Sequence, residues 1–321
     1  MASVSCWRDP DSESNKNARV TVTEATMVKK TQLGKSIDIT LIRDVPYATQ
    51  SEAQKLDIYM KSKKGKPCPV IMWMHPGGFY EGDKDGSAIA PLAIINMIKL
   101  VQPMLERGYA AVSINYRLSH EAIFPALIFD VKAAVRWIKA NAAKYNFQPD
   151  TVAAWGSSAG GYLSAMLATT ADVKELEDLS MGDPDQSSRV NAAVDWYGPT
   201  DFLLMDPQHI QLGQEAHVHD ASSPESRLMG ASVMLIPEKC KAASPMTYIK
   251  PGNAPLYIQQ GKGDPVIPYP QSVMLAEQMA AAIGKENVIL NLVEKVGHAD
   301  PIFFTTENVN KVLDFVDRYM K

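Results

Sequence analysis

The chain has 321 residues, of which 46% are hydrophobic, and its 32 basic and 36 acidic residues leave a net charge of −4. This length and composition can bury one large core, so they exclude a disordered chain and predict a single catalytic domain. The acidic balance and the shortness of the basic run at residues 61–66 exclude nucleic acid as a partner. The three cysteines are too few for a disulfide framework and lack metal-ligand spacing, so neither disulfides nor a zinc site are predicted.

The first part of the sequence carries charges at short intervals. Residues 1–18 are polar and are expected to form a loose tail, followed by one domain over residues 19–321. The tail has no apolar stretch suited to a signal peptide, and the longest apolar stretch, residues 88–101, is shorter than the roughly 20 residues that span a bilayer. We therefore expect a cytoplasmic protein without membrane contact, or a secreted one if a signal peptide has been removed.

The elements predicted along the chain alternate between strands and helices. Residues 19–30, 37–48 and 54–62 alternate apolar and polar side chains as strands do, whereas the apolar run 68–75 is typical of a strand buried on both faces. The pattern then predicts a helix at 88–109, strands at 110–117, 151–155, 190–198, 254–262 and 288–296, and helices at 124–146, 159–170, 270–284 and 305–320. This order predicts an α/β fold with a mostly parallel, doubly wound sheet of about eight strands.

Residues 202–246 connect two predicted strands and are far longer than an ordinary crossover, which predicts a small cap-like insertion. We expect the cap to combine an apolar slot for a short acyl group with a polar-tolerant alcohol site. The side chains expected to line these two parts are Tyr80, Met205, Leu212, His209, Gln214 and His217. Because the segment carries many polar residues, it does not predict the broad apolar patch of a lipase.

A GxSxG pattern, Gly156 to Gly160, lies between a predicted strand and a predicted helix. Small residues at both ends of the pattern suit a sharp turn that lifts the Ser158 hydroxyl above the strand end. The same turn directs the backbone N–H of Ala159 toward the space beside that hydroxyl, at a helix N-terminus that favours negative charge. The pattern therefore predicts a nucleophile together with part of an oxyanion-binding site.

Further polar residues follow the ends of other predicted strands, where ligands bind in open parallel sheets. The sequence HPGG begins at His75, Asp264 lies in GKGDPVIP, and His298 lies in VGHADP. The chain order Ser158, Asp264, His298 is the order of α/β hydrolases.

Over residues 35–321 the sequence resembles the α/β hydrolase superfamily, in the carboxylesterase and hormone-sensitive-lipase-like branch that includes carbohydrate acetyl and feruloyl esterases. The resemblance implies Ser158 as nucleophile, His298 as base and Asp264 as its acid partner. It also implies oxyanion donors at Gly77, Gly78 and Ala159. Motif residues interpreted as scaffold are Tyr116, Arg117, Leu118, Glu121, Phe124, Pro125 and Asp130, and residues 223–230 are also similar to this branch.

Two positions depart from the branch's usual pattern. Pro76 replaces a glycine of the oxyanion loop, but proline lacks an N–H and the implied donors are the glycines that follow it. Gln260 stands where a non-catalytic histidine is usual.

Alternatives remain for individual residues. Asp201 and Asp300 also follow strand ends and are candidate acids, with Asp264 favoured over both. His75 is interpreted as a structural residue of the oxyanion loop. His217 and His219 form an HxH pair, but without a third ligand nearby they predict a surface loop rather than a metal site.

These features predict a serine carboxylic-ester hydrolase that works through an acyl-enzyme without cofactor or metal. The expected substrates are short-chain acyl esters, in particular acetyl or feruloyl esters of plant-polysaccharide fragments. The sequence does not predict an oligomeric state. An arylformamidase-type hydrolase is the alternative. A non-catalytic ligand-binding protein on this scaffold is less favoured because no triad residue is missing, and a propeller-bearing peptidase would need a longer chain.

Overall fold

The computed structural model describes residues 23–30, 36–62, 65–87 and 96–321. The expected tail, residues 1–18, lies outside the described residues, as do residues 88–95 of the helix expected at 88–109. The described part of that helix begins at Met97, where the side chain of Asn96 accepts a hydrogen bond from Lys99 N at 3.1 Å. This N-cap bond satisfies a backbone N–H of the first turn that has no acceptor within the helix, and so stabilises the helix start.

The described strands form one nine-stranded sheet with the order β1-β2-β3-β5-β4-β6-β7-β8-β9. Pairing is antiparallel from β1 to β5 and parallel from β5 through β9, so the mostly parallel α/β fold is confirmed. The strands are β1 (Thr23–Lys30), β2 (Ser36–Pro46), β3 (Lys55–Lys61), β4 (Cys68–Met74), β5 (Ala110–Ile114), β6 (Phe147–Ser157), β7 (Ala192–Trp196), β8 (Leu256–Gly261) and β9 (Val288–Val293).

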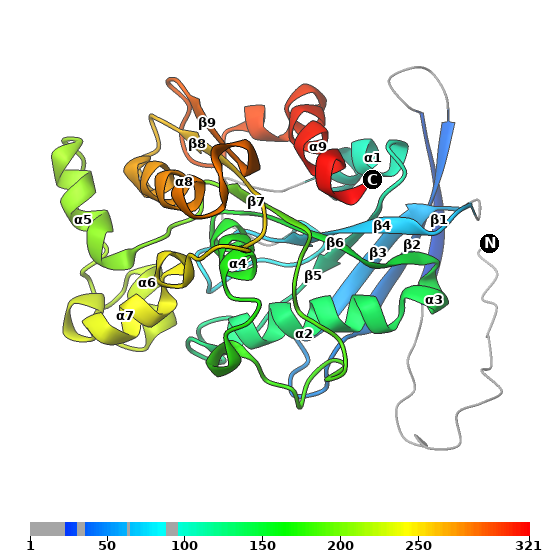
Figure 1. Ribbon diagram of the computed structural model, residues 1–321, viewed down its shortest axis with the longest axis horizontal. Coiled ribbons are helices and arrows are strands. Elements are labelled where there is room, and N and C mark those ends of the chain that lie inside the picture. Colours follow the sequence, from blue (N-terminus) through cyan, green and yellow to red (C-terminus); the bar gives the residue numbers. More distant parts are fainter. Residues whose placement is uncertain (1–22, 31–35, 63–64, 88–95) are drawn as a thin grey trace.

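Helices cover both faces of the sheet (Figure 1). Residues of α1 and α9 pack in one core cluster, and residues of α2, α4 and α8 pack in the other. The helices are α1 (Met97–Glu106), α2 (Ala126–Ala140), α3 (Ala142–Tyr145), α4 (Ala159–Thr169), α5 (Phe202–Gln211), α6 (Pro224–Met229), α7 (Pro237–Ala243), α8 (Pro270–Ile283) and α9 (Thr306–Met320). The helix expected at 124–146 is divided into α2 and α3 at Asn141, whose side-chain amide donates to Trp137 O at 2.9 Å.

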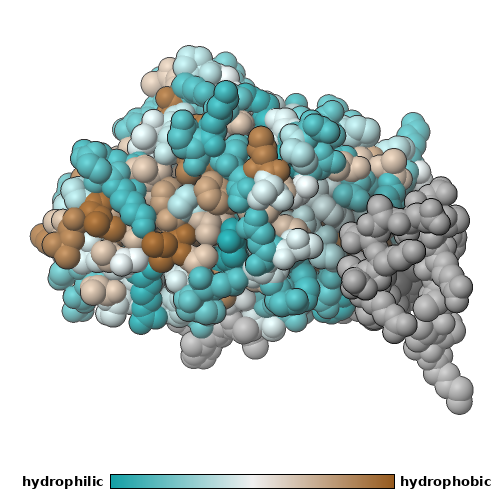
Figure 2. Space-filling view, turned by 90° about the horizontal axis from the view of Figure 1, so that it is seen from below, coloured by the Kyte–Doolittle hydropathy of each residue, from teal (hydrophilic) through white to brown (hydrophobic). Residues whose placement is uncertain are grey.

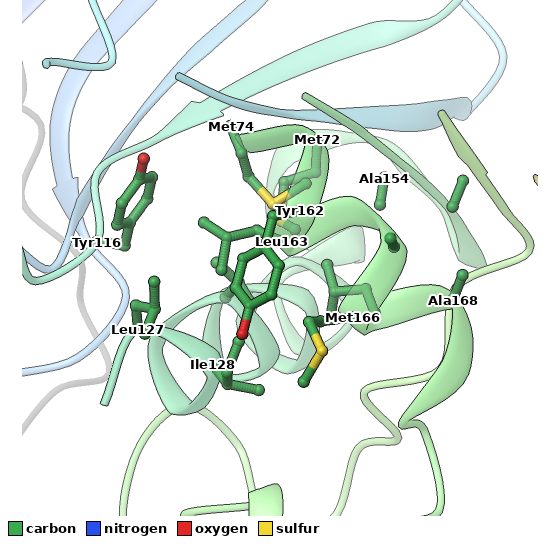
Figure 3. Close-up of a cluster of buried hydrophobic side chains, with 14 of the residues drawn as sticks. Met72, Met74, Tyr116, Leu127, Ile128, Ala154, Tyr162, Leu163, Met166 and Ala168 are labelled. Carbon is green, nitrogen blue, oxygen red and sulfur yellow. The ribbon is translucent and has the colours of Figure 1, made fainter. Parts of the chain in front are cut away.

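Every residue of α4 is buried. Figure 3 shows Tyr162, Leu163 and Met166 of this helix among side chains of α2 and of the strands β4 and β6. On the other face of the sheet, Trp73 and Trp196 pack edge to face with their ring centroids 6.0 Å apart. The helix that begins at the GxSxG turn is therefore held by packing in the centre of the molecule, which fixes the position of its N-terminus.

The segment 202–246 contains α5, α6 and α7, which lie together at one end of the molecule (Figure 1). The hydroxyl of Tyr162 on α4 donates to Ala243 O at 2.8 Å. At the end of the segment, Ser244 Oγ donates to Thr200 O at 2.8 Å. These bonds tie the segment to α4 and to the loop after β7.

Among the helices of the described residues, none combines the length and the apolar character needed to cross a membrane.

Asp195 on β7 is a buried carboxyl with one oxygen satisfied. Its Oδ1 accepts from Gly198 N at 2.8 Å, while Oδ2 has no hydrogen-bond partner among the described residues. Burial raises the pKa of Asp195 to about 7. The folded protein therefore keeps the Asp195 proton at pH values where the unfolded chain, with a pKa near 4, has released it. The contribution of protonated Asp195 to the free energy of unfolding is fully present below pH 4 and is lost as the pH rises through about 7.

We expect Asp195→Asn to become more stable relative to the wild type as the pH rises from 4 to 7. The amide cannot ionise, so it avoids the burial of a charge, and the difference in unfolding free energy should change by on the order of 4 kcal/mol over this range. Urea unfolding of both proteins at pH 4.5, 6 and 8 measures this difference in unfolding free energy. If this difference is the same at all three pH values, burial does not raise the pKa of Asp195 and the prediction is wrong.

Candidate active site

Ser158 lies in a strained turn between β6 and α4. Its backbone has φ 53° and ψ −118°, and its N–H donates to Trp196 O on β7 at 2.8 Å. A positive φ is unfavourable for serine and is typical of the turn that presents a nucleophile. Ser157 is completely buried, whereas 8% of Ser158 is exposed, so Ser158 is the serine of the pair that a substrate can reach.

The two glycines of the GxSxG pattern permit close backbone approach. A Cβ on Gly156 would lie 2.2 Å from Gly160 O, and a Cβ on Gly160 would lie 2.1 Å from Met74 O. Any side chain at either position would therefore collide with the backbone of the turn or of β4. This contact explains why the turn needs glycine at both ends.

Three residues from separate loops form one hydrogen-bonded chain. His298 Nε2 lies 3.0 Å from Ser158 Oγ, and His298 Nδ1 lies 2.7 Å from Asp264 Oδ2. A carboxylate oxygen only accepts, so neutral His298 carries its proton on Nδ1 and leaves the Nε2 lone pair for the serine hydroxyl. This is the tautomer that can remove a proton from Ser158.

The loop after β4, in which the expected oxyanion donors Gly77 and Gly78 lie, is held by contacts of His75. His75 is stacked on Tyr116 with ring centroids 4.3 Å apart, and its Nδ1 donates to Pro76 O at 2.7 Å. Burial lowers the pKa of His75 to about 4, so this histidine is neutral at ordinary pH and acts by holding the loop. The scaffold motif is also anchored, because Arg117 pairs with buried Asp130 at 2.8 Å.

Three backbone N–H groups near the turn lack acceptors. Among the described residues, none of the recorded hydrogen bonds uses the N–H of Gly77, Gly78 or Ala159. Gly77 and Gly78 have φ values of 131° and 56°, a conformation that glycine adopts without strain. Free N–H groups at these positions are available to a ligand with a developing negative charge.

The competing acids have other partners. Asp201 Oδ1 accepts from Leu203 N at 3.0 Å and caps α5. Asp300 Oδ1 accepts from Ile302 N at 2.9 Å and caps the turn that follows it. Both carboxylates are therefore used for capping, while Asp264 is the acid that contacts His298.

The HxH pair organises a loop. Both His217 and His219 donate their backbone N–H to Asp206, and His219 Nδ1 lies 2.8 Å from Asp206 Oδ2. Across the described residues, no group of three or more His, Cys, Asp or Glu side chains is arranged to hold a metal ion.

Some residues expected to line the substrate site have different surroundings. Met205 is completely buried in the core cluster of α4. His209, also fully buried, shares a 2.8 Å hydrogen bond with Gln214 Oε1, and Gln214 Nε2 donates to Asp264 O at 3.0 Å. His209 and Gln214 therefore connect the insertion to the acid loop rather than offering free donors. Tyr80 is 37% exposed, with the guanidinium of Arg227 5.3 Å from its ring centroid.

Tyr197 and Gln260 were not assigned site roles from the sequence. The Tyr197 ring packs edge-on against His298, with centroids 4.9 Å apart, and the Gln260 amide donates to Asp264 Oδ2 at 2.8 Å. Tyr197 directly follows β7, so its place at a strand end was the available signal.

A parallel sheet with a strained serine at the end of β6 and a histidine and an acid after β9 and β8 defines an α/β hydrolase. The sequence profile of the family described as BD-FAE matches residues 56–279, about two thirds of the chain. The chain belongs to this family. The matched stretch includes the oxyanion loop, Ser158 and Asp264, while His298 lies beyond it.

Individual proteins support the assignment. Esterase LipQ of Mycobacterium tuberculosis is 30% identical over 233 residues, which are 71% of this chain and 50% of LipQ. A truncated carbohydrate esterase from gut microbiota is 32% identical with a TM-score of 0.75, covering 87% of this chain and 96% of that one. A bifunctional GH43-CE protein of Bacteroides eggerthii is 29% identical, also with a TM-score of 0.75, over 88% of this chain and 35% of that chain. The chain spans about half the length of LipQ.

Ser158→Ala should abolish ester hydrolysis and leave the melting temperature close to that of the wild type. The change removes one hydroxyl, on which the proposed attack depends, from a residue that is not fully enclosed. Ser157→Ala is the matched control and should retain most activity. Loss of activity in Ser157→Ala alone would show that the nucleophile is misassigned.

Asp264→Asn should lower kcat by about ten-thousandfold, the size of the corresponding effect in serine proteases, because an amide NH₂ facing His298 Nδ1 favours the wrong tautomer. Asp201→Asn keeps the acceptor that caps α5 and should change kcat little. Steady-state kinetics of the two purified variants compares them. The opposite ranking would transfer the acid role to Asp201.

Proposed function

We propose that this protein is a serine carboxylic-ester hydrolase that acts through an acyl-enzyme on short acyl esters. The observation that carries the proposal is the continuous chain from Ser158 Oγ through His298 to Asp264 Oδ2, with bonds of 3.0 and 2.7 Å. It is supported by the esterase and carbohydrate esterase names of the relatives.

In the first half of the reaction, Ser158 Oγ forms a bond to the ester carbonyl carbon while its proton moves to His298 Nε2. The carbonyl oxygen becomes an oxyanion, and the free N–H groups of Gly77, Gly78 and Ala159 are the proposed donors to it. Each such donor contributes about 3 to 4 kcal/mol of transition-state stabilisation in enzymes where it has been removed. The C–O bond then breaks, and His298 returns the proton to the leaving alcohol.

In the second half, a water molecule takes the place of the alcohol. His298 accepts one proton from the water as its oxygen attacks the acyl carbon, and Ser158 recovers its proton when the acyl group leaves as an acid. Asp264 stabilises the imidazolium in both halves and holds the Nδ1–H tautomer between them.

We further propose acetyl or feruloyl esters on plant-polysaccharide fragments as the substrates. Support comes from the truncated carbohydrate esterase from gut microbiota, 96% of whose chain is covered at 32% sequence identity. The segment 202–246 is proposed as the cap of this site. It contacts the acid loop through Gln214, and Pro224 lies close to Gly78, since a Cβ on that glycine would be 3.3 Å from Pro224 Cβ.

The surface of the insertion is less polar than its sequence suggests. Figure 2 shows apolar side chains gathered at the end of the molecule that holds α5 to α7. The exposed large hydrophobic residues of the segment are Leu204, Ile210, Met234 and Leu235. The test of acyl preference therefore needs to include long chains.

The proposal predicts that kcat/KM falls as the acyl chain of p-nitrophenyl esters lengthens from acetate to decanoate. Acetylated xylan and feruloyl esters should be hydrolysed, and addition of EDTA should leave the rate unchanged. A higher kcat/KM for decanoate than for acetate would contradict the short-acyl site. Cleavage of N-formylkynurenine in preference to every ester would favour the arylformamidase alternative.

A further inference from the structure

Gln260 is a fully buried amide on β8 that contacts the acid of the proposed triad. Its Nε2 donates to Asp264 Oδ2 at 2.8 Å, which is the same oxygen that accepts from His298 Nδ1. On its other side, Ser272 Oγ from α8 donates to Gln260 Oε1 at 3.2 Å. Gln260 therefore connects α8 to the acid without reaching the reacting atoms.

The surroundings allow one orientation of this amide. Nε2 also lies 3.3 Å from Gly261 O and 3.2 Å from Ile267 O. These carbonyls and the Asp264 carboxylate can only accept hydrogen bonds, so the NH₂ group must face all three. The fixed amide offers Asp264 a donor in a constant direction.

The carboxylate of Asp264 uses its full acceptor capacity. Oδ1 accepts from Val266 N at 2.8 Å and Ile267 N at 2.9 Å, and Oδ2 accepts from Gln260 and His298. A carboxylate has about four acceptor positions, so every position has a donor. Three of the four donors belong to β8 and the acid loop, and they hold the carboxylate in place for the fourth, His298.

We propose that Gln260 is a positioning residue of the triad, which holds Asp264 Oδ2 toward His298 with a donor whose charge does not change with pH. This inference rests on the proposed function of Ser158, Asp264 and His298. Loss of the Gln260 donor would let the carboxylate turn, and His298 would lose the partner that selects its Nδ1–H tautomer.

The charges around Asp264 explain why an uncharged donor suits position 260. Among the described residues, the titratable groups around this site include Asp264 itself, His298 at the same oxygen, and Tyr197, whose ring packs on His298. The buried carboxyl of Glu225 on α6 also interacts electrostatically with His298. From α8, the packed partner is the hydroxyl of Ser272. A cation in place of Gln260 would compete with His298 for the negative charge of Asp264, whereas the amide leaves that charge to the imidazole.

Gln259, the preceding residue of β8, provides a matched control. It is 1% exposed, and its side chain exchanges two hydrogen bonds with Asn308 of α9, at 2.7 and 2.9 Å. The two glutamines thus have the same side chain, the same strand and nearly the same burial. They differ in their partners, because Gln259 is hydrogen-bonded to Asn308 and Gln260 is hydrogen-bonded to Asp264.

The experiment compares Gln260→Ala and Gln260→Glu with Gln259→Ala and Gln259→Glu in the full chain. Gln260→Ala should lower kcat roughly 10- to 100-fold, the effect of losing one hydrogen bond to a charged group, with KM within about twofold of wild type. Gln259→Ala should lower the melting temperature to a similar extent but leave kcat within about threefold of wild type. Equal losses of kcat in the two alanine variants would overturn the proposal.

The near-isosteric Gln260→Glu variant guards against misfolding and adds a pH readout. A glutamate beside Asp264 can donate to Oδ2 only when it is protonated, and burial and the like charge both favour that form. Its kcat relative to wild type should therefore rise as the pH falls from 8 to 6, while the ratio for Gln259→Glu stays constant. A ratio for Gln260→Glu that falls as the pH falls would also overturn the proposal, because the protonated form would then fail to replace the amide donor.

Labelling with a fluorophosphonate separates this inference from the proposed substrate. Ser158 Oγ forms a bond to phosphorus, fluoride leaves, and the serine proton moves to His298, so the labelling rate reports the triad without an ester. If wild type is labelled at Ser158 but hydrolyses none of the esters, the substrate proposal fails and Gln260 is still tested by the labelling rates. Gln260→Ala labelled as fast as wild type would overturn the positioning role, and no labelling of wild type at Ser158 would overturn the serine mechanism itself.

Discussion

The hydrogen bond between His298 Nδ1 and Asp264 Oδ2 is the contact on which the site depends, because it joins the loops after β8 and β9 and sets the tautomer that faces Ser158. The serine is 140 residues away from His298 in the chain. These two side chains are in contact because β6, β8 and β9 are parallel, and the carboxyl ends of the three strands lie along one edge of the sheet. The fold thus contributes three aligned loop positions, and the side chains contribute the chemistry.

The position of Ser158 depends in turn on packing far from any substrate. Helix α4 is buried along its whole length, so the turn at its N-terminus cannot relax its positive φ without moving the helix within the core. The same burial has a cost at Asp195, whose Oδ2 is unpaired among the described residues. The carboxyl lies beside this helix, since a Cβ on Gly161 would be 2.4 Å from Asp195 Oδ1. The core that holds Ser158 in a strained conformation therefore also holds a carboxyl whose pKa is raised by burial.

The positions of the strands along the chain, the glycine turn and the strand-end loops could be predicted from the sequence because hydrophobic periodicity and local turn chemistry determine them. Contacts between distant side chains outside these motifs could not. His209 and Gln214 appeared as free donors, but the fold places them together and directs Gln214 to the acid loop. Likewise Asp195 appeared as one polar residue in an apolar strand, and periodicity does not show that its Oδ2 lacks a partner. The roles of the triad and of the oxyanion donors remain predictions.

Three of the hydrogen bonds that attach the insertion to the rest of the molecule end on backbone acceptors. Tyr162 donates to Ala243 O, Ser244 donates to Thr200 O, and Gln214 donates to Asp264 O. The Ala243 carbonyl belongs to the backbone, so this hydrogen bond does not depend on the side chain at position 243, which is itself fully buried in the core. Substitution of exposed side chains of the insertion, such as Leu204, Ile210 and Leu235, can therefore proceed while α4 keeps its anchor, which makes residues 202–246 the segment to vary when the proposed substrate preference is tested.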